Sequence, residues 1–81
     1  MVTVTVGTLG HMIAGARGAA GLSQARLAGR LGVRQPSVSE WESGRSVPSV
    51  PMLHALTVEL DLDPGGLLAA AAAAVREGEP P

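Results

Sequence analysis

Arginine supplies all of the positively charged side chains in this 81-residue chain, and most of them lie in one stretch. Between positions 17 and 45, five arginines face only two glutamates, which leaves a net charge of +3. A guanidinium group can bind a phosphate or a guanine through two parallel hydrogen bonds. Residues 46–81 carry −4, and the whole chain carries −1. This asymmetry favours one face that meets a polyanion, although the same arginines could form an ordinary solvated surface. They are Arg17, Arg26, Arg30, Arg34 and Arg45.

Side chains that can recognise bases lie among these arginines. A glutamine can bind adenine through two hydrogen bonds, and a glutamate can accept one from the amino group of cytosine. Gln35 and Glu40 fit these roles, and Arg34 fits either a guanine or a phosphate. Pro36 can offer only an apolar contact, for example to a thymine methyl group. Glu40 could also be solvated, or could reject phosphates rather than read a base.

Residues for catalysis or metal binding do not occur at useful spacing. His11 and His54 are 43 positions apart, and the chain has no cysteine. No glycine-rich phosphate loop, nucleophile elbow or zinc motif is present. Trp41 is the single aromatic residue, which excludes a base-stacking surface of the kind found in single-strand binders. We therefore expect no enzyme, no cofactor and no metal ion.

The periodicity of apolar residues predicts an all-α domain of five helices that positions these side chains. The first helix begins at Thr8, which can cap it, and ends near Gly21. Ser23, Ser49 and Asp63 cap the second, fourth and fifth helices. The third helix spans residues 35–43, and the fourth has apolar residues at positions 53, 56, 58 and 60. We expect the domain at residues 8–76, with the helix-turn-helix at 23–44 and a disordered tail at 77–81.

The alternating valines and threonines of residues 1–7 predict a frayed tail or a short strand. This start has no basic region and too short an apolar run for a signal peptide. The alanine run at 69–74 is also far shorter than the roughly 20 residues of a membrane span. We therefore expect a cytoplasmic, nucleoid-associated protein with no membrane partner.

Residues at characteristic spacing extend through both helices of the predicted helix-turn-helix. They are Gly21, Leu22, Ser23, Gln24, Leu27, Ala28, Leu31, Gly32, Val33, Val38, Ser39, Trp41, Glu42, Ser43, Gly44, Arg45 and Pro48. This pattern closely resembles the Cro and lambda-repressor-like family, also called XRE-type. The resemblance covers about residues 8–68. It implies a compact five-helix domain whose third helix enters the major groove of DNA.

The resemblance also implies roles for individual residues. Gln24 is expected to bind a phosphate and to brace the third helix, and Arg17 is expected to form a structural ion pair with Glu42. Residues at the start and on the outer face of the third helix read bases, and those just after it contact phosphates. The implied DNA-binding set is Gln24, Arg34, Gln35, Pro36, Ser37, Ser39, Glu40, Ser43 and Arg45.

These features together predict a sequence-specific regulator of transcription that binds double-stranded DNA. We expect a repressor that binds an inverted-repeat operator as a homodimer, with a protein partner such as a toxin as a further possibility. Either the C-terminal alanine helix or the N-terminal valines could supply the dimer surface. The alternative is a non-catalytic module that uses the same fold to bind proteins.

Overall fold

The computed structural model describes residues 7–77, which form five helices and contain no strand. The expected all-α fold is therefore confirmed. The helices are α1 (Gly7–Ala19), α2 (Gln24–Leu31), α3 (Gln35–Ser43), α4 (Val50–Leu60) and α5 (Pro64–Glu77). Within residues 7–77, no helix is long and apolar enough to cross a lipid bilayer.

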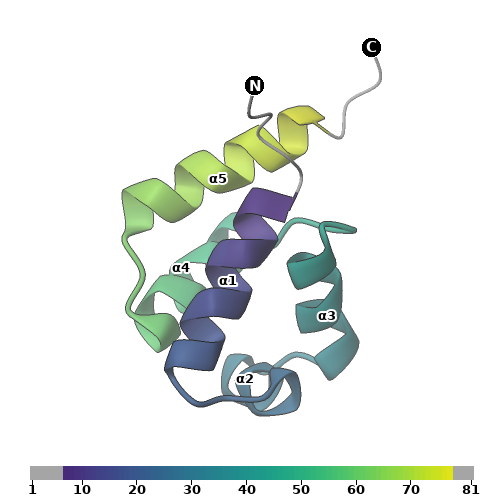
Figure 1. Cartoon of the computed structure of the whole chain (residues 1–81), viewed down its shortest axis with the longest axis vertical. Coiled ribbons are helices and arrows are strands. Elements are labelled where there is room, and N and C mark those ends of the chain that lie inside the picture. Colours follow the sequence, from purple (N-terminus) through teal and green to yellow (C-terminus); the bar gives the residue numbers. More distant parts are fainter. Residues whose placement is uncertain (1–6, 78–81) are drawn as a thin grey trace.

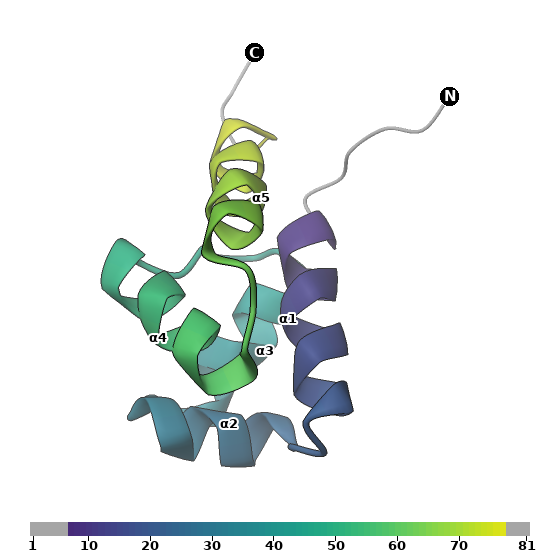
Figure 2. The ribbon, with the colours of Figure 1, turned by 90° about the vertical axis from the view of Figure 1, so that its left-hand side faces the viewer.

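The other four helices are arranged along the length of α1 (Figure 1). α1 runs between α5 at one end of the molecule and α2 at the other, while α3 lies beside α1 and α2 (Figure 1). A quarter turn shows α5 crossing above α1 and α4, on which it packs (Figure 2). α3 thus packs on α1 and α2, α2 packs also on α4, and the outer face of α3 remains open.

Every helix contributes side chains to one apolar core. The apolar residues of each helix recur at intervals of three and four, so they share one face and turn the polar residues outward. On α3 this pattern buries Val38 completely and leaves Trp41 only 7% exposed. The buried residues that join them are Leu9, Ile13, Leu22, Leu27, Ala28, Leu53, Leu56, Leu60, Leu67, Ala70, Ala71 and Ala74.

Polar caps and glycines fix the ends of the helices. The hydroxyl oxygens of Ser23 and Ser49 accept hydrogen bonds from backbone N–H groups of the first turns of α2 and α4. An Asp63 carboxylate oxygen accepts from the Gly66 N–H at 2.7 Å in the same way. Gly32 and Gly44 end α2 and α3 with φ of 74° and 82°, a left-handed conformation that glycine adopts without steric cost.

The first and the last helix each extend one residue beyond residues 8–76. α1 already includes Gly7, so Thr8 lies inside the helix and does not cap it from outside. α5 continues through Glu77, the first residue of the expected tail. The valine–threonine alternation of residues 2–6 and the last four residues, 78–81, lie outside the described residues.

Not all apolar residues of the last two helices are buried. Val58, expected among the apolar residues of the fourth helix, is 69% exposed. One side of the alanine helix is buried, because Leu67, Ala70, Ala71 and Ala74 pack into the core. Leu68 and Val75 remain more than half exposed on the same helix.

A glycine allows α1 and α3 to come into close contact. A β-carbon at Gly10 would overlap the backbone carbonyl of Glu42 and would lie 3.0 Å from the carbonyl oxygen of Trp41. Backbone atoms cannot move aside as a flexible side chain can, so α1 could not keep its present distance from the end of α3. Gly15 on the same helix has no atom within 4 Å of the equivalent position.

We expect Gly10→Ala to lower the free energy of unfolding by about 1–3 kcal/mol, because the two helices must separate. Gly15→Ala is the matched control, since alanine is favoured over glycine inside a helix by up to about 1 kcal/mol. Urea unfolding of both variants measures the difference. Equal effects would show that the α1–α3 contact tolerates a side chain at Gly10.

Candidate nucleic-acid interface

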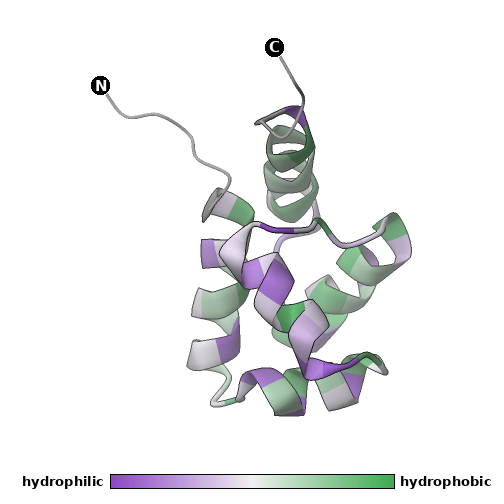
Figure 3. Ribbon diagram, turned by 90° about the vertical axis from the view of Figure 1, so that its right-hand side faces the viewer, coloured by the Kyte–Doolittle hydropathy of each residue, from purple (hydrophilic) through white to green (hydrophobic). Residues whose placement is uncertain are grey.

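The outer face of α3 gathers most of the residues implied to read bases. Gln35, Pro36 and Glu40 are exposed, and Ser37 and Ser39 are partly exposed, because Val38 and Trp41 anchor the opposite face of the helix. Figure 3 looks onto this side of the molecule, where α3 crosses the front and carries mostly hydrophilic residues. The outward-facing residues of α3 are Gln35, Pro36, Glu40 and Ser43.

Two exposed arginines flank the helix. Arg34 is the N-cap residue of α3; its backbone is extended, and its side chain makes no capping hydrogen bond. Arg45 follows the end of α3, and its backbone N–H donates to the carbonyl oxygen of Glu40 at 2.9 Å. This backbone bond fixes the direction in which the chain leaves the helix. The Ser43 hydroxyl donates to the same carbonyl at 3.2 Å, so a phosphate would have to compete for that proton.

A network of hydrogen bonds connects the recognition face to α1. Arg17 donates through Nε and Nη2 to the two carboxylate oxygens of Glu42, at 2.6 and 3.0 Å. Its Nη1 donates to the backbone carbonyl of Leu22 at 2.8 Å, which ties down the turn before α2. Gln24 donates to Glu42 at 2.9 Å, and Gln35 donates to Gln24 at 2.7 Å. The network is therefore partly buried at Arg17 and Glu42, and it reaches the surface at Gln35.

The network determines which way the two amide groups point. An ionised carboxylate only accepts hydrogen bonds, so Gln24 turns its NH₂ group toward Glu42 and its oxygen toward Gln35. Gln35 must then donate to Gln24 through its own NH₂ group. The oxygen and the second N–H of Gln35 are left without a partner in this network, and this pair matches the adenine edge.

The charged pair is more buried than any other ion pair in the described residues. The side chains of Arg17 and Glu42 are 20% and 8% exposed, against 53% and 33% for Arg30 and Glu59, whose charged atoms are 3.8 Å apart. Burial raises the pKa of the Glu42 carboxyl, but hydrogen bonds from Arg17 and Gln24 and the charge of Arg17 outweigh it. The pKa of Glu42 is thus lowered, and the hydrogen bond to Glu42 raises the pKa of Arg17.

The sequence does not predict all of the contacts in this site. The resemblance implied the Arg17–Glu42 pair and a bracing role for Gln24, but no sequence pattern indicated that Gln24 touches both Glu42 and Gln35. Arg26 and Arg30 belong to the basic stretch without joining the network, since they project from the exposed face of α2. The spacing of seven between Gln35 and Glu42 is two helical turns, which places both residues on one side of α3 but does not indicate that Gln24 lies between them.

We expect Arg17→Ala and Glu42→Ala each to cost about 3 kcal/mol of unfolding free energy, because each strands the other charge. The double variant should lose less than the sum of the two. The Glu42 contribution should also depend on pH. Its folded-state pKa is lowered, so its stabilisation is complete above about pH 4.5 and is lost as the pH falls through the folded pKa.

A double-mutant cycle followed by urea unfolding at pH 7 and pH 3 measures these effects. The Arg30–Glu59 pair serves as the control, since an exposed pair contributes about 0–1 kcal/mol. Additive losses at Arg17 and Glu42 would show that the two residues do not stabilise each other.

Comparison with known proteins places this geometry in a family. A search of curated proteins gave no significant match. A family model described as a helix-turn-helix domain matches residues 8–75, which include all of the described part except residues 7, 76 and 77. α2 and α3 within that range are the two helices of the motif, joined at Gly32. The chain therefore belongs to the helix-turn-helix domain family, in its Cro/XRE-like group.

Proposed function

We propose that this protein is a non-catalytic regulator of transcription that binds double-stranded DNA with α3 in the major groove. One observation carries the proposal above the others. A hydrogen-bond network that starts at a partly buried ion pair ends on Gln35, whose free amide atoms match the edge of adenine. A side chain held in this way loses little conformational entropy when it binds, which favours recognition of a base over a general surface contact.

The residues around Gln35 divide into two groups in this proposal. Gln35, Ser39 and Glu40 read base edges, with apolar or weaker contacts from the neighbouring Pro36 and Ser37. Phosphates are held by Arg34 and Arg45, by the second N–H of Gln24 and by Ser43. Phosphate contacts set the position of the domain on the duplex, and base contacts select the sequence.

A single copy of the domain has few cations with which to hold DNA. Arg34 and Arg45 are the arginines that flank α3, and each neutralised phosphate contributes about −0.9 to the salt dependence of binding. One protomer would thus reach a slope of only about −2. Two copies double the contacts and read half-sites about 34–36 Å apart on one face of the duplex. We therefore propose a homodimer on an inverted-repeat operator, which represses by occupying its site.

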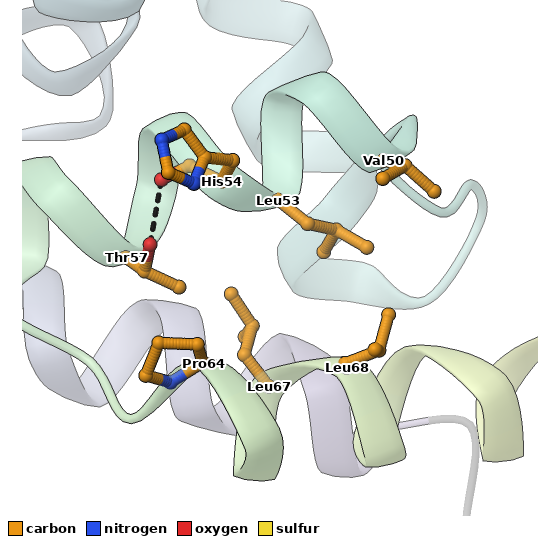
Figure 4. Close-up of a pocket in the computed structure, with 7 residues that line it drawn as sticks. All are labelled: Val50, Leu53, His54, Thr57, Pro64, Leu67 and Leu68. Carbon is orange, nitrogen blue, oxygen red and sulfur yellow. Dashed lines mark hydrogen bonds between the residues drawn. The ribbon is translucent and has the colours of Figure 1, made fainter.

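A second copy of this chain is the partner that we propose for the groove between α4 and α5. The groove encloses about 150 Å³. Val50 and Leu68 stand at its rim, 71% and 55% exposed (Figure 4). Leu68, Ala72 and Val75 are spaced by four and three residues, so they form an exposed stripe beside it. The groove is lined by Val50, Leu53, His54, Thr57, Pro64, Leu67 and Leu68.

The charge distribution supports self-association over a charged partner. Residues 64–75 of α5 carry no ionisable side chain, and Glu59, the one acidic residue of α4, faces Arg30 of α2. The same surface presents both the groove and a ridge beside it, which is the stripe of Leu68, Ala72 and Val75. A two-fold axis would place the ridge of each copy against the groove of the other, as an isologous interface requires.

We expect Gln35→Ala to weaken binding to the preferred site by about 1–3 kcal/mol and to relax selection at one base pair. Arg45→Ala should weaken binding to all sequences alike and should reduce the salt slope by about one unit per protomer. Fluorescence anisotropy with a duplex selected from a random library, and with an unselected duplex, separates the two effects. Identical behaviour of both variants would contradict the division into base and phosphate contacts.

We expect Leu68→Glu to convert a dimer into a monomer, because it places a charge in an apolar interface. Val58→Glu is the matched control, since Val58 is as exposed on α4 but does not line the groove. Sedimentation velocity at micromolar concentration, with and without DNA, measures the change. An unmodified chain that stays monomeric in both conditions contradicts the dimer, and a dimeric Leu68→Glu variant places the interface elsewhere.

A further inference from the structure

The recognition helix carries negative charge and no positive charge. α3 contains two glutamates and neither lysine nor arginine. Glu42 is neutralised by Arg17, which leaves Glu40 as the charge that α3 presents outward. Glu40 follows Pro36 by four residues and precedes Ser43 by three, and all three are exposed on one side of the helix. A carboxylate therefore stands in the middle of the face that is proposed to enter the major groove.

The neighbouring arginines do not neutralise this carboxylate. Among the described residues, the ion pairs within 4.0 Å are Arg17–Glu42 and Arg30–Glu59. Arg34 and Arg45 thus make no ion pair with Glu40. Glu40 is held in place through its backbone, since its carbonyl oxygen accepts bonds from the N–H of Arg45 and the hydroxyl of Ser43. The backbone of Glu40 is therefore fixed, and its carboxylate has no ion-pair partner within that distance.

A carboxylate in this position would be repelled by most DNA. It meets the phosphates of both strands, and it must give up water as the groove closes around it. It can only accept hydrogen bonds, whereas guanine and thymine present acceptors in the major groove. The amino groups of cytosine and adenine are the donors available there. Each base pair has one such amino group, but it lies on one strand only. The penalty is therefore offset where the base on the strand next to Glu40 is cytosine or adenine, and it remains where that base is guanine or thymine.

We propose that Glu40 is a specificity-determining residue that acts mainly against incorrect sites. It lowers the affinity of the domain for DNA in general, and it is tolerated where the amino group of a cytosine or adenine donates to it. Specificity that comes from repulsion of the wrong partner adds to the attraction supplied by Gln35. This inference rests on the proposed function, because it assumes that α3 enters the major groove.

Glu40→Gln tests this proposal directly. A glutamine of nearly the same shape has both a donor and an acceptor, so it accommodates any base and is not repelled by phosphates. We expect the variant to bind an unselected duplex about tenfold more tightly, within the range of one base contact. Its salt slope on that duplex should steepen, by up to about one unit per protomer. Selection from a random library should lose the preference for an amino-bearing base at one position of the half-site.

Asp61→Asn is the matched control for the change in net charge. Asp61 is exposed in the turn after α4, outside α2 and α3, and its φ of 54° is a conformation that asparagine tolerates well. We expect this variant to keep the affinity ratio between the selected and the unselected duplex. Thermal unfolding of both variants checks that they fold as the unmodified chain does.

The outcomes separate this inference from the function on which it rests. If the unmodified chain binds all duplexes equally, the proposed function is wrong and this inference falls with it. If the unmodified chain selects a site and Glu40→Gln keeps both its base preference and its weak binding to unselected DNA, only the role of Glu40 is overturned. An equal gain in unselected binding by Asp61→Asn also overturns it, because net charge would then explain the effect.

Discussion

Arg17 uses three nitrogen atoms to hold two partners, the Glu42 carboxylate on α3 and the Leu22 carbonyl before α2. These contacts fix both helices of the motif against α1. The Glu42 side chain is only 8% exposed, so loss of its partner would leave a charge with little access to water. The pair is therefore costly to break, and the hydrogen bonds of Gln24 and Gln35 depend on it. Gly10 supports the same arrangement, since its lack of a side chain brings α1 against the backbone of Glu42.

The remaining charges complement this arrangement. Positive charge lies at the two ends of α3, whereas the α4–α5 surface carries almost none. In the proposed function, affinity for phosphates and selection of bases fall to different residues, because α3 itself contains no lysine or arginine. The lack of charge on the α4–α5 surface is what supports the proposal that a second copy binds there.

Local sequence signals predicted most of the helix boundaries for a clear physical reason. Ser23, Ser49 and Asp63 satisfy N–H groups that a helix start leaves unpaired, and this requirement acts over three residues only. Capping signals predict the start of the first helix at Thr8, one residue late, because Gly7 has no capping side chain although it is helical in the fold. Val58 is one of the apolar residues of α4, but its place on the helix turns it to solvent, unlike Leu53, Leu56 and Leu60.

The sequence by itself determined the five helices, the buried side of α3 and the outward position of Gln35 and Glu40, because periodicity and capping depend on near neighbours. The resemblance to a family added the Arg17–Glu42 pair. Only the tertiary structure brought Gln24 between Glu42 and Gln35, placed Gly10 against α3 and divided α5 into a buried and an exposed side. These features join residues on different helices. Their contacts depend on how the helices cross, and the spacing of residues along the chain does not determine the distance between two helices.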